Sequence, residues 1–323
     1  VTGNCGIVMQ QNTTYLCDDL CRLCPWRWHA CEIRRPLPVI WITSYPKSGN
    51  TWIRSFLASL LYKDYNTNVF SNLDKIKQFP GRSLFKNFVH DFQSIDEVYK
   101  NWLNVQSYIN LDNKIKFLKT HHANCSVKNY KLFDDINTLG AIHIVRDPRN
   151  VLTSIKNHFA LEDFDEAKKF IVSEKKWIGI SKSKDKTIED NDDNIIPTLI
   201  SSWKINYLSW KNQTKNYILI KYEDLIKDPY KEFFKISNYL EKVMNTKFDE
   251  NEVVGAIKQT SFKNMQNLEK KGFFNEYIKR EDNKKIKFFN LGPKNDWKSY
   301  LNNEIVEEIN FKFKNEMKEL GYL

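Results

Sequence analysis

Residues 44–52, with the sequence SYPKSGNTW, could hold a phosphate group. They follow an apolar run at 39–43, VIWIT, and precede a run at 53–62 with apolar residues at helical spacing. The first backbone N–H groups of a helix are unpaired and lie at the positive end of its dipole, so a strand–turn–helix junction favours an anion. The groups that could contact this anion belong to Lys47, Ser48, Gly49, Asn50 and Thr51.

The order of these residues separates the loop from the Walker A loop of nucleotide kinases. A Walker A loop has four residues between two glycines, followed by Lys and then Ser or Thr, whereas here Lys47 precedes a single glycine, Gly49. Gly49 lets the backbone approach a ligand closely, and Trp52 offers a flat face that could stack on a purine. The alternative interpretation is an ordinary polar turn.

A second polar cluster ends the stretch KIKFLKTHH at 114–122. A histidine at the end of a strand can act as a general base, and we expect His121 to do so beside Lys119. Successive side chains of a strand point to opposite faces, so His122 should turn away from this site. Taken alone, His121 would more often be a packed or solvated histidine.

A third cluster follows the apolar run AIHIV at 141–145. Arg146 ends this run and Ser154 lies on the helix expected next, so the two could hold a second phosphate. Asp147 can cap that helix, and Pro148 can take its first position. A lone Arg146 would more often be the partner in a surface ion pair.

These clusters need a sheet that brings the ends of several strands together. Runs expected to be strands alternate with helical segments and lie at 39–43, 114–122, 141–145 and 217–225. This alternation predicts one α/β domain with a central parallel sheet flanked by helices, in which ligands bind beyond the carboxyl ends of the strands. Asp228 and Pro229 repeat the cap-and-proline start of a helix. Residues 303–323 are expected to form an amphipathic helix with Gly321 near its end.

The composition is that of a soluble globular protein of 323 residues, with 41% hydrophobic and 28% charged residues. No run approaches the roughly 18 apolar residues that a membrane span needs, so we expect none. The formal charge of +10 favours anionic partners such as nucleotides, nucleic acids or acidic glycans, with a general compositional bias as the alternative. The charged stretch at 181–194 is expected to be a solvated loop rather than a lid.

The cysteines are concentrated at one end of the chain. Five of the six precede residue 32, at Cys5, Cys17, Cys21, Cys24 and Cys31. Their spacing matches no zinc pattern, so residues 1–36 are interpreted as an extension outside the fold, with a metal or disulfide site as the alternative. The expected domain at 37–323 contains only Cys125, which is typical of a reducing compartment, and we expect a cytoplasmic protein.

Taken together, these motifs resemble the PAPS-dependent sulfotransferase family, over about residues 37–323. YPKSGNTW is similar to the family's phosphosulfate-binding loop, usually YPKSGTTW, and KTHH resembles the segment with the catalytic histidine. IVRDPRNVLTS resembles the segment that binds the 3′-phosphate. Further matches are KYEDL at 221–225, TSF at 260–262 and GPKNDWKSYL at 292–301.

The resemblance implies a P-loop-NTPase-like fold and transfer of a sulfuryl group from PAPS (3′-phosphoadenosine 5′-phosphosulfate) to a hydroxyl or amine, with PAP as product and no metal. His121 would be the base, and Lys47 and Lys119 would stabilise charge. The residues that would bind the nucleotide are Lys47, Ser48, Gly49, Asn50, Thr51, Trp52, Arg146, Ser154, Tyr222, Thr260, Ser261, Phe262, Gly292 and Lys294.

The sequence departs from the family pattern at three places. Asn50 replaces the usual first threonine of the loop, and His122-Ala123 replaces the usual Leu-Pro. The Arg-Lys pair expected before Gly292 is Asn290-Leu291, which removes two cations from the 3′-phosphate side. The basic residues that could substitute for that pair are Lys294, Lys285 and Lys287.

Two other functions are alternatives to sulfuryl transfer. A P-loop-type nucleotide kinase would need a Walker loop and an acidic magnesium ligand after a strand, and the sequence has neither. A non-catalytic binder of acidic glycans or nucleic acid would place basic residues in one stripe with interleaved aromatics. We expect a small-molecule or glycan acceptor and no nucleic acid. The aromatic stretch that could line an acceptor pocket, but is better explained as helix core, contains Phe79, Phe85, Phe88, Phe92 and Trp102.

Overall fold

The described part of the chain forms a compact unit, assigned as Pro36–Leu323. The computed structural model describes residues 38–62, 68–112, 114–180, 196–274, 278–279, 285–286, 288–289 and 292–323. The cysteine-rich segment 1–36, the charged stretch 181–194 and Asn290-Leu291 lie outside these residues. The division of the chain at residue 36 therefore stays a prediction.

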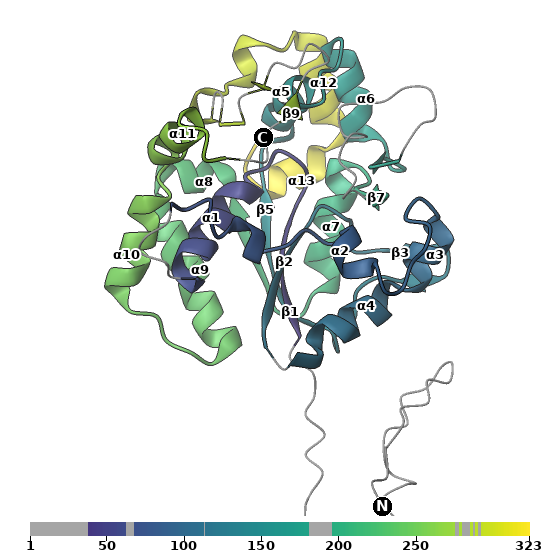
Figure 1. The fold of residues 1–323 in the computed structure, drawn as a ribbon. Helices are drawn as coiled ribbons and strands as arrows, with labels where there is room; N and C mark the ends of the chain where they lie inside the picture. Colours follow the sequence, from purple (N-terminus) through teal and green to yellow (C-terminus); the bar gives the residue numbers. More distant parts are fainter. Residues whose placement is uncertain are drawn as a thin grey trace, which may run out of the picture. The chain divides into compact units, whose positions relative to one another are not determined.

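Among the described residues, parallel strands in the order β2–β1–β5–β8 form the central sheet (Figure 1). Their bounds are β1 Val39–Ser44, β2 Lys116–Thr120, β5 Thr138–Val145 and β8 Tyr217–Lys221. Because β1 pairs with β2 on one side and β5 on the other, the chain reverses its direction across the sheet at β1. Ligands bind at such a switch point in open α/β sheets, and the predicted parallel α/β fold is confirmed.

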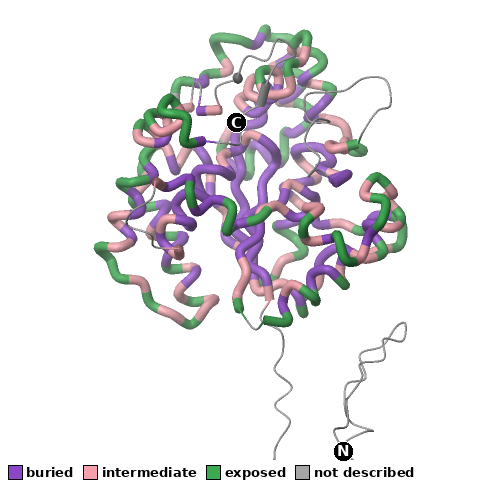
Figure 2. Tube along the Cα trace, viewed as in Figure 1, coloured by how far each residue is buried: buried purple, intermediate pink, exposed green. Residues whose placement is uncertain are grey.

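Helices cover both faces of the sheet (Figure 1). Ile40 and Ile42 of β1 belong to the core cluster on one face, whereas Val39 and Trp41 belong to the cluster on the other. All residues of β1 are buried, and Figure 2 shows the central strands as buried. This burial on both faces explains why the strand reads as a continuous apolar run. Helices that contribute to the first cluster are α1 Asn50–Leu61, α8 Tyr222–Lys227, α9 Pro229–Met244, α10 Glu250–Gln259 and α11 Phe262–Lys270.

The second face and the region beyond the carboxyl end of β5 hold the other helices. They are α2 Arg82–Phe85, α3 Ile95–Lys100, α4 Trp102–Ile109, α5 Pro148–His158, α6 Phe164–Val172, α7 Trp203–Gln213, α12 Asn303–Lys312 and α13 Lys314–Glu319. Short strand pairs are β3 Ser126–Val127 with β4 Tyr130–Lys131, β6 Trp177–Ile178 with β7 Thr198–Leu199, and β9 Ile278–Lys279 with β10 Lys285–Ile286. Short 3-10 helices are η2 Leu73–Lys75, η3 Asn110–Asp112, η5 Gly292–Lys294 and η6 Trp297–Ser299.

Both predicted cap-and-proline helix starts are confirmed. Asp147 accepts a hydrogen bond from the backbone N–H of Arg149, and Pro148 is the first residue of α5. Asp228 likewise accepts from the backbone N–H of Lys231 at the start of α9. The side-chain oxygens satisfy N–H groups that a helix leaves unpaired.

Two predicted elements differ from the structure. The strand expected at 217–225 ends at Lys221, and α8 begins at Tyr222. Tyr222 and Leu225 are both buried, which is helical spacing, and acidic residues in the first turn favour a helix start. The single helix expected at 303–323 is divided at Phe313, and α13 ends before Gly321, whose φ is 72°.

Three of the five aromatic residues expected to form core are fully buried, whereas Phe88 and Phe92 are half-buried against the same cluster and lie outside the helices. Phe79, Phe85 and Trp102 have no exposed surface and contact one another through their rings. These three side chains therefore help to attach α2 and α4 to the sheet.

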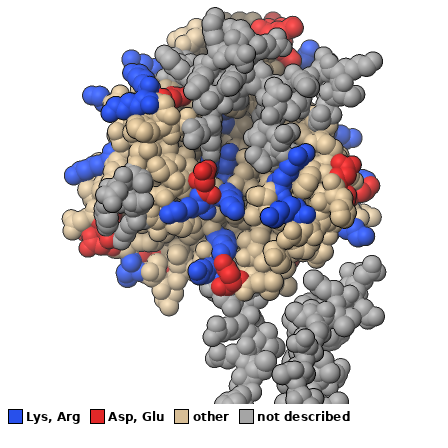
Figure 3. Space-filling view, viewed as in Figure 1, with Lys and Arg blue, Asp and Glu red and all other residues tan. Residues whose placement is uncertain are grey.

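On the face drawn in Figure 3, Lys and Arg lie in separate groups with Asp and Glu between them. The single basic stripe expected of a nucleic-acid binder is not visible in that view. None of the helices in the described ranges has the length and apolar character that crossing a membrane requires.

Candidate active site

The loop between β1 and α1 presents an uncapped helix N-terminus. No side chain caps α1 at Gly49, and its first turn contains no acidic residue. Lys47 and Gly49 have φ angles of 67° and 106°, so the backbone turns twice through the left-handed region. Ser48 Oγ is buried without a hydrogen-bond partner among the described residues. Unpaired N–H groups, the dipole and a buried hydroxyl together favour an anion at this loop.

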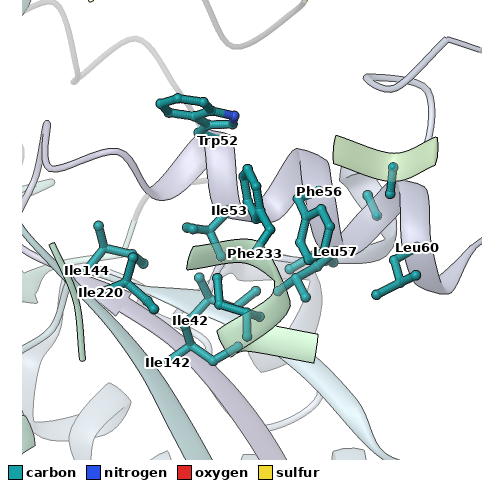
Figure 4. Close-up of a cluster of buried hydrophobic side chains, with 14 of the residues drawn as sticks. Ile42, Trp52, Ile53, Phe56, Leu57, Leu60, Ile142, Ile144, Ile220 and Phe233 are labelled. Atoms are coloured by element: carbon teal, nitrogen blue, oxygen red, sulfur yellow. The ribbon is translucent and has the colours of Figure 1, made fainter. Parts of the chain in front are cut away.

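The helix behind the loop is held firmly by apolar contacts. Figure 4 shows Ile53, Phe56 and Leu57 of α1 packed against isoleucines of the sheet and Phe233 of α9, with Trp52 at the start of the helix. The Asn50 side chain also turns inward and donates hydrogen bonds to Ile42 O and Ser44 Oγ, at 3.3 and 3.2 Å. Asn50 therefore offers an anion its backbone N–H rather than its amide. The predicted contacts of Asn50 and the buried Thr51 with a phosphate stay predictions.

Tyr222 fills the space that the missing side chain of Gly49 leaves. A Cβ atom on Gly49 would lie 2.6 Å from Tyr222 Cδ2, in addition to the unfavourable φ angle. The Tyr222 ring also contacts Trp52 edge-on, with 6.1 Å between ring centroids, and stacks under the Arg146 guanidinium at 4.3 Å. The start of α8 at Tyr222, which the sequence analysis missed, thus places this ring beneath the loop.

Arg146 and Ser154 lie side by side, as the spacing of the motif suggested. Arg146 Nη1 donates to Ser154 Oγ at 3.3 Å and to Lys47 O at 3.0 Å. The Arg146 Nε atom is buried without a hydrogen-bond partner among the described residues. One guanidinium therefore connects the end of β5, the loop after β1 and the middle of α5.

A buried network fixes the backbone next to Arg146. Glu223 accepts a hydrogen bond from the backbone N–H of Asp147 at 3.0 Å and another from the Tyr322 hydroxyl at 2.9 Å. Arg149 pairs with Asp147 at 2.7 Å and donates to Tyr322 O at 2.8 Å. Burial raises the pKa of Glu223, while these hydrogen bonds favour its charged form. No local sequence signal connects these residues.

A pocket of about 380 Å³ lies at the start of α11, and its lining includes three of the predicted nucleotide-binding residues. Its lining consists of Trp52, Ile226, Pro229, Tyr230, Phe233, Ile257, Lys258, Ser261 and Phe262. The rings of Trp52 and Phe262 are 6.3 Å apart and tilted by 60°. Ser261 faces this pocket, whereas the Thr260 hydroxyl donates back to Ala256 O. Of the two residues proposed to contact the nucleotide here, the geometry therefore favours Ser261.

Gly292 lies against the ring of Phe262, one of the residues that line this pocket. Its φ is 51°, and a Cβ atom there would lie 1.9 Å from Phe262 Cζ. Lys294 is exposed in η5. The side chains of Lys285 and Lys287 fall outside the described residues, as does Asn290-Leu291, so the replacement of the family's Arg-Lys pair stays open.

The position of His121 fixes its tautomer. His121 Nδ1 lies 2.8 Å from Ser44 O and 3.2 Å from Ser44 Oγ. Because the nearer partner is a carbonyl that can only accept, Nδ1 carries the hydrogen of the neutral ring. Nε2 is then the atom with a free lone pair. Burial, and next the charge of Lys119, lowers the pKa of His121 to about 3. Asn206 holds the backbone by donating to His121 O at 2.9 Å.

His122 points away from His121 into the aromatic core. Its Nδ1 bonds to Ala123 O at 2.6 Å, its Nε2 lies 2.8 Å from the Tyr99 hydroxyl, and the ring contacts Trp102. The alternation expected at the end of β2 is therefore observed. Because His122 is fully buried, its substitution would affect stability rather than contacts with a ligand.

The charged groups around Lys47 are mostly basic. Burial, Arg146 and Lys119 together lower the pKa of Lys47 to about 7, and Glu269 opposes them. Lys47 Nζ lies 4.0 Å from the centre of the Phe288 ring and 3.4 Å from His158 Nδ1.

His158 is not among the site residues expected from the sequence. The sequence feature that could have identified it is its position four residues after Ser154, which places both residues on the same face of α5.

Comparisons with known proteins support one family. Residues 37–321 match the family model described as the sulfotransferase domain. The chain belongs to the sulfotransferase domain family.

Relatives include luciferin sulfotransferase from Photinus pyralis, 25% identical over 282 residues, covering 82% of this chain and 68% of the relative. Amine sulfotransferase from Oryctolagus cuniculus is 25% identical over 302 residues, covering 87% of this chain and 81% of the relative. A structure of retinol dehydratase with androsterone and PAP shares the fold, with a TM-score of 0.54, 16% identity, and coverage of 88% of this chain and 82% of that one.

As a member of this family, the chain is a PAPS-dependent sulfotransferase. Within the described ranges, this sulfotransferase brings together no group of three or more His, Cys, Asp or Glu side chains that could hold a metal ion.

Replacing Gly49 with alanine should disable the loop of this sulfotransferase. Gly49→Ala adds a methyl group against Tyr222 and forces an L-residue into a φ of 106°. We expect PAP affinity to fall at least about 10-fold and the free energy of unfolding to fall by about 1–3 kcal/mol, measured by calorimetry and urea denaturation.

The matched control is Gly255→Ala in α10, where an added Cβ meets nothing within 4 Å. That variant should bind PAP normally and be slightly more stable, because alanine favours helix. Normal PAP binding by Gly49→Ala would contradict the interpretation of the loop.

Proposed function

We propose that this sulfotransferase moves the sulfuryl group of PAPS to a hydroxyl or amine of a small molecule, with His121 as general base and Lys47 as the main charge-stabilising residue. The observation that carries the proposal is the meeting of Lys47, Arg146 and His121 beyond the carboxyl ends of three neighbouring strands. Ligands of open α/β sheets bind at this edge.

The residues present fit the nucleotide. Ser48 Oγ and Arg146 Nε are buried polar atoms without partners among the described residues, as expected of groups that complete their hydrogen bonds with a ligand. Gly49 and Gly292 allow close approach to aromatic rings of the site. Arg146 with Ser154 would hold the 3′-phosphate, the loop would hold the 5′-phosphosulfate, and Trp52 with Phe262 would contact the adenine.

His121 is suited to accept the acceptor's proton. Its Nδ1–H is committed to Ser44 O, so Nε2 is the basic atom. The lowered pKa keeps the ring neutral at physiological pH but weakens Nε2 as a base, which the negative charge of bound PAPS would offset. A base must be unprotonated to act. We therefore expect no loss of activity through protonation of His121 as pH falls from 8 to 6.

Lys47 is suited to stabilise negative charge. PAPS, when bound, supplies a sulfuryl group whose sulfur–oxygen bond breaks as the acceptor's oxygen or nitrogen bonds to sulfur, leaving PAP with the bridging oxygen and its electrons. Lys47 would donate a hydrogen bond where that charge develops, and Lys119 would add a second cation. Such a group is most effective in a site that excludes water, where charges are weakly screened.

The acceptor is proposed to be a small molecule. Relatives are named for luciferin, amines and flavonol, and by analogy this chain would take a compound with one reactive hydroxyl or amine. An acidic glycan is the alternative acceptor, because the chain carries a formal charge of +10. Glycan binding without catalysis and phosphoryl transfer from ATP are the competing functions.

Formation of PAP tests the reaction. The protein is incubated with sulfur-labelled PAPS and panels of phenols, alcohols, amines and sulfated or unsulfated glycans, with and without EDTA. We expect labelled product and equal amounts of PAP from small molecules, unaffected by EDTA. Product only with ATP and magnesium would support the kinase instead, and binding of glycans without any PAP would support the non-catalytic function.

His121→Asn should remove the basic nitrogen of His121 while keeping the hydrogen bond that positions the side chain. Asparagine can still donate to Ser44 O, but it lacks the Nε2 atom. We expect kcat to fall by roughly 10²-fold or more with PAP affinity nearly unchanged, measured by steady-state kinetics and calorimetry. His122→Asn is the matched control and should lower thermal stability while leaving kcat close to wild type. The opposite pattern would assign the base to His122.

The lowered pKa of Lys47 predicts an alkaline limb in the pH profile of kcat/KM for PAPS, that is, a fall in kcat/KM as pH rises. The ammonium binds an anion and the neutral amine does not, so kcat/KM for PAPS should fall as pH rises through about 7 in the free enzyme. Lys47→Arg stays charged, so its profile should lack this limb, whereas ionisation of the nucleotide affects both proteins alike. An identical limb in Lys47→Arg would show that another group causes it.

A further inference from the structure

His158 contacts the side chain on which the proposed reaction depends. It is the last residue of α5, and its Nδ1 lies 3.4 Å from Lys47 Nζ. A lysine ammonium has three N–H donors and no acceptor, so Nδ1 must be the acceptor of this hydrogen bond. The neutral His158 ring then carries its hydrogen on Nε2. The two residues are 111 positions apart in the chain.

Among the residues that the structure describes, the charged groups near Lys47 are mostly cations, which cannot accept its hydrogen bonds. Arg146 at the end of β5 and Lys119 on β2 are cations that disfavour its charge, and Glu269 on α11 favours it. The Phe288 ring lies over the ammonium at 4.0 Å. Glu269 also accepts the backbone N–H groups of Phe288 and Phe289, so part of its capacity is used.

His158 is suited to remain a neutral acceptor in this surrounding. Burial and the nearby Lys47, Lys119 and His121 hold its pKa well below the usual value. A protonated imidazole would have no lone pair to offer and would repel the ammonium. A neutral His158 instead compensates part of the repulsion that Lys47 experiences from Arg146 and Lys119.

We propose that His158 is a positioning residue for Lys47: it accepts one of the three hydrogen bonds of the ammonium, holds the side chain toward the end of α5, and favours its charged form. Two N–H groups of Lys47 remain for the phosphosulfate. His158 acts through Lys47 and takes no proton from substrate. The proposal rests on the proposed role of Lys47 in sulfuryl transfer.

The test compares substitutions that keep or remove the acceptor atom. His158→Asn places an amide oxygen near the position of Nδ1, whereas His158→Leu has similar bulk and no acceptor. His158→Ala is a second acceptor-free variant in case leucine does not fit. Asn157→Ala, at the exposed preceding residue, is the control for changes at the end of the helix.

The main readout is the titration of Lys47 in the ligand-free protein. The Cε chemical shift of Lys47 is followed against pH in lysine-labelled protein and assigned by its disappearance in Lys47→Arg. Loss of a hydrogen bond to a charged group should lower the midpoint by about one pH unit in His158→Leu and His158→Ala. The midpoint should stay close to wild type in His158→Asn and Asn157→Ala.

The alkaline limb of kcat/KM for PAPS should shift in the same direction and by the same amount. Unchanged midpoints in both acceptor-free variants, with normal PAP binding, would overturn the role of His158 while leaving the proposed function intact. A large fall in kcat for His158→Asn without a change in midpoint would make His158 a proton acceptor and also overturn the proposal. Failure of the wild-type protein to bind PAP would instead overturn the proposed function, and with it any role of His158 in transfer.

Discussion

The hydrogen bond from Arg146 to the carbonyl oxygen of Lys47 joins the end of β5 to the loop after β1. It helps hold Lys47 in the left-handed region, which a residue with a Cβ rarely adopts. The loop can then turn again at Gly49 and enter α1 without a side-chain cap on its first N–H groups. The same guanidinium contacts Ser154 and stacks on Tyr222, so three segments are held by one side chain.

The cluster of cations at this site is electrostatically unfavourable in the free protein. Lys47 is buried close to two other cations, Lys119 and Arg146, and the negative charge of Glu269 opposes them only in part. The pKa of Lys47 therefore falls to about 7. Such a cluster destabilises the free protein but is suited to an anion with several charges, because the ligand supplies the missing negative charge. Two neutral histidines, His121 and His158, border the cluster without adding to its charge. The site therefore lowers the stability of the free protein and raises its affinity for an anion.

Support for the site comes from parts of the chain far from its motifs. Glu223 connects the backbone beside Arg146 to the Tyr322 hydroxyl, after the last helix. Tyr222 supports both Gly49 and Trp52 from α8. A substitution that displaces Tyr322 should therefore affect the backbone beside Arg146 through Glu223.

The sequence by itself determined the features that depend on neighbouring residues. Burial on both faces of β1, the Asp147 cap of α5 and the strand–loop–helix around Gly49 arise from local period, capping and turn chemistry, and the motifs add the family. Only the tertiary structure decided that the Asn50 amide turns inward, that Tyr222 starts a helix, and that His158 meets Lys47. Contacts between residues 111 positions apart leave no periodic trace in a sequence, because they arise only when packing of the helices on the sheet brings the two side chains together.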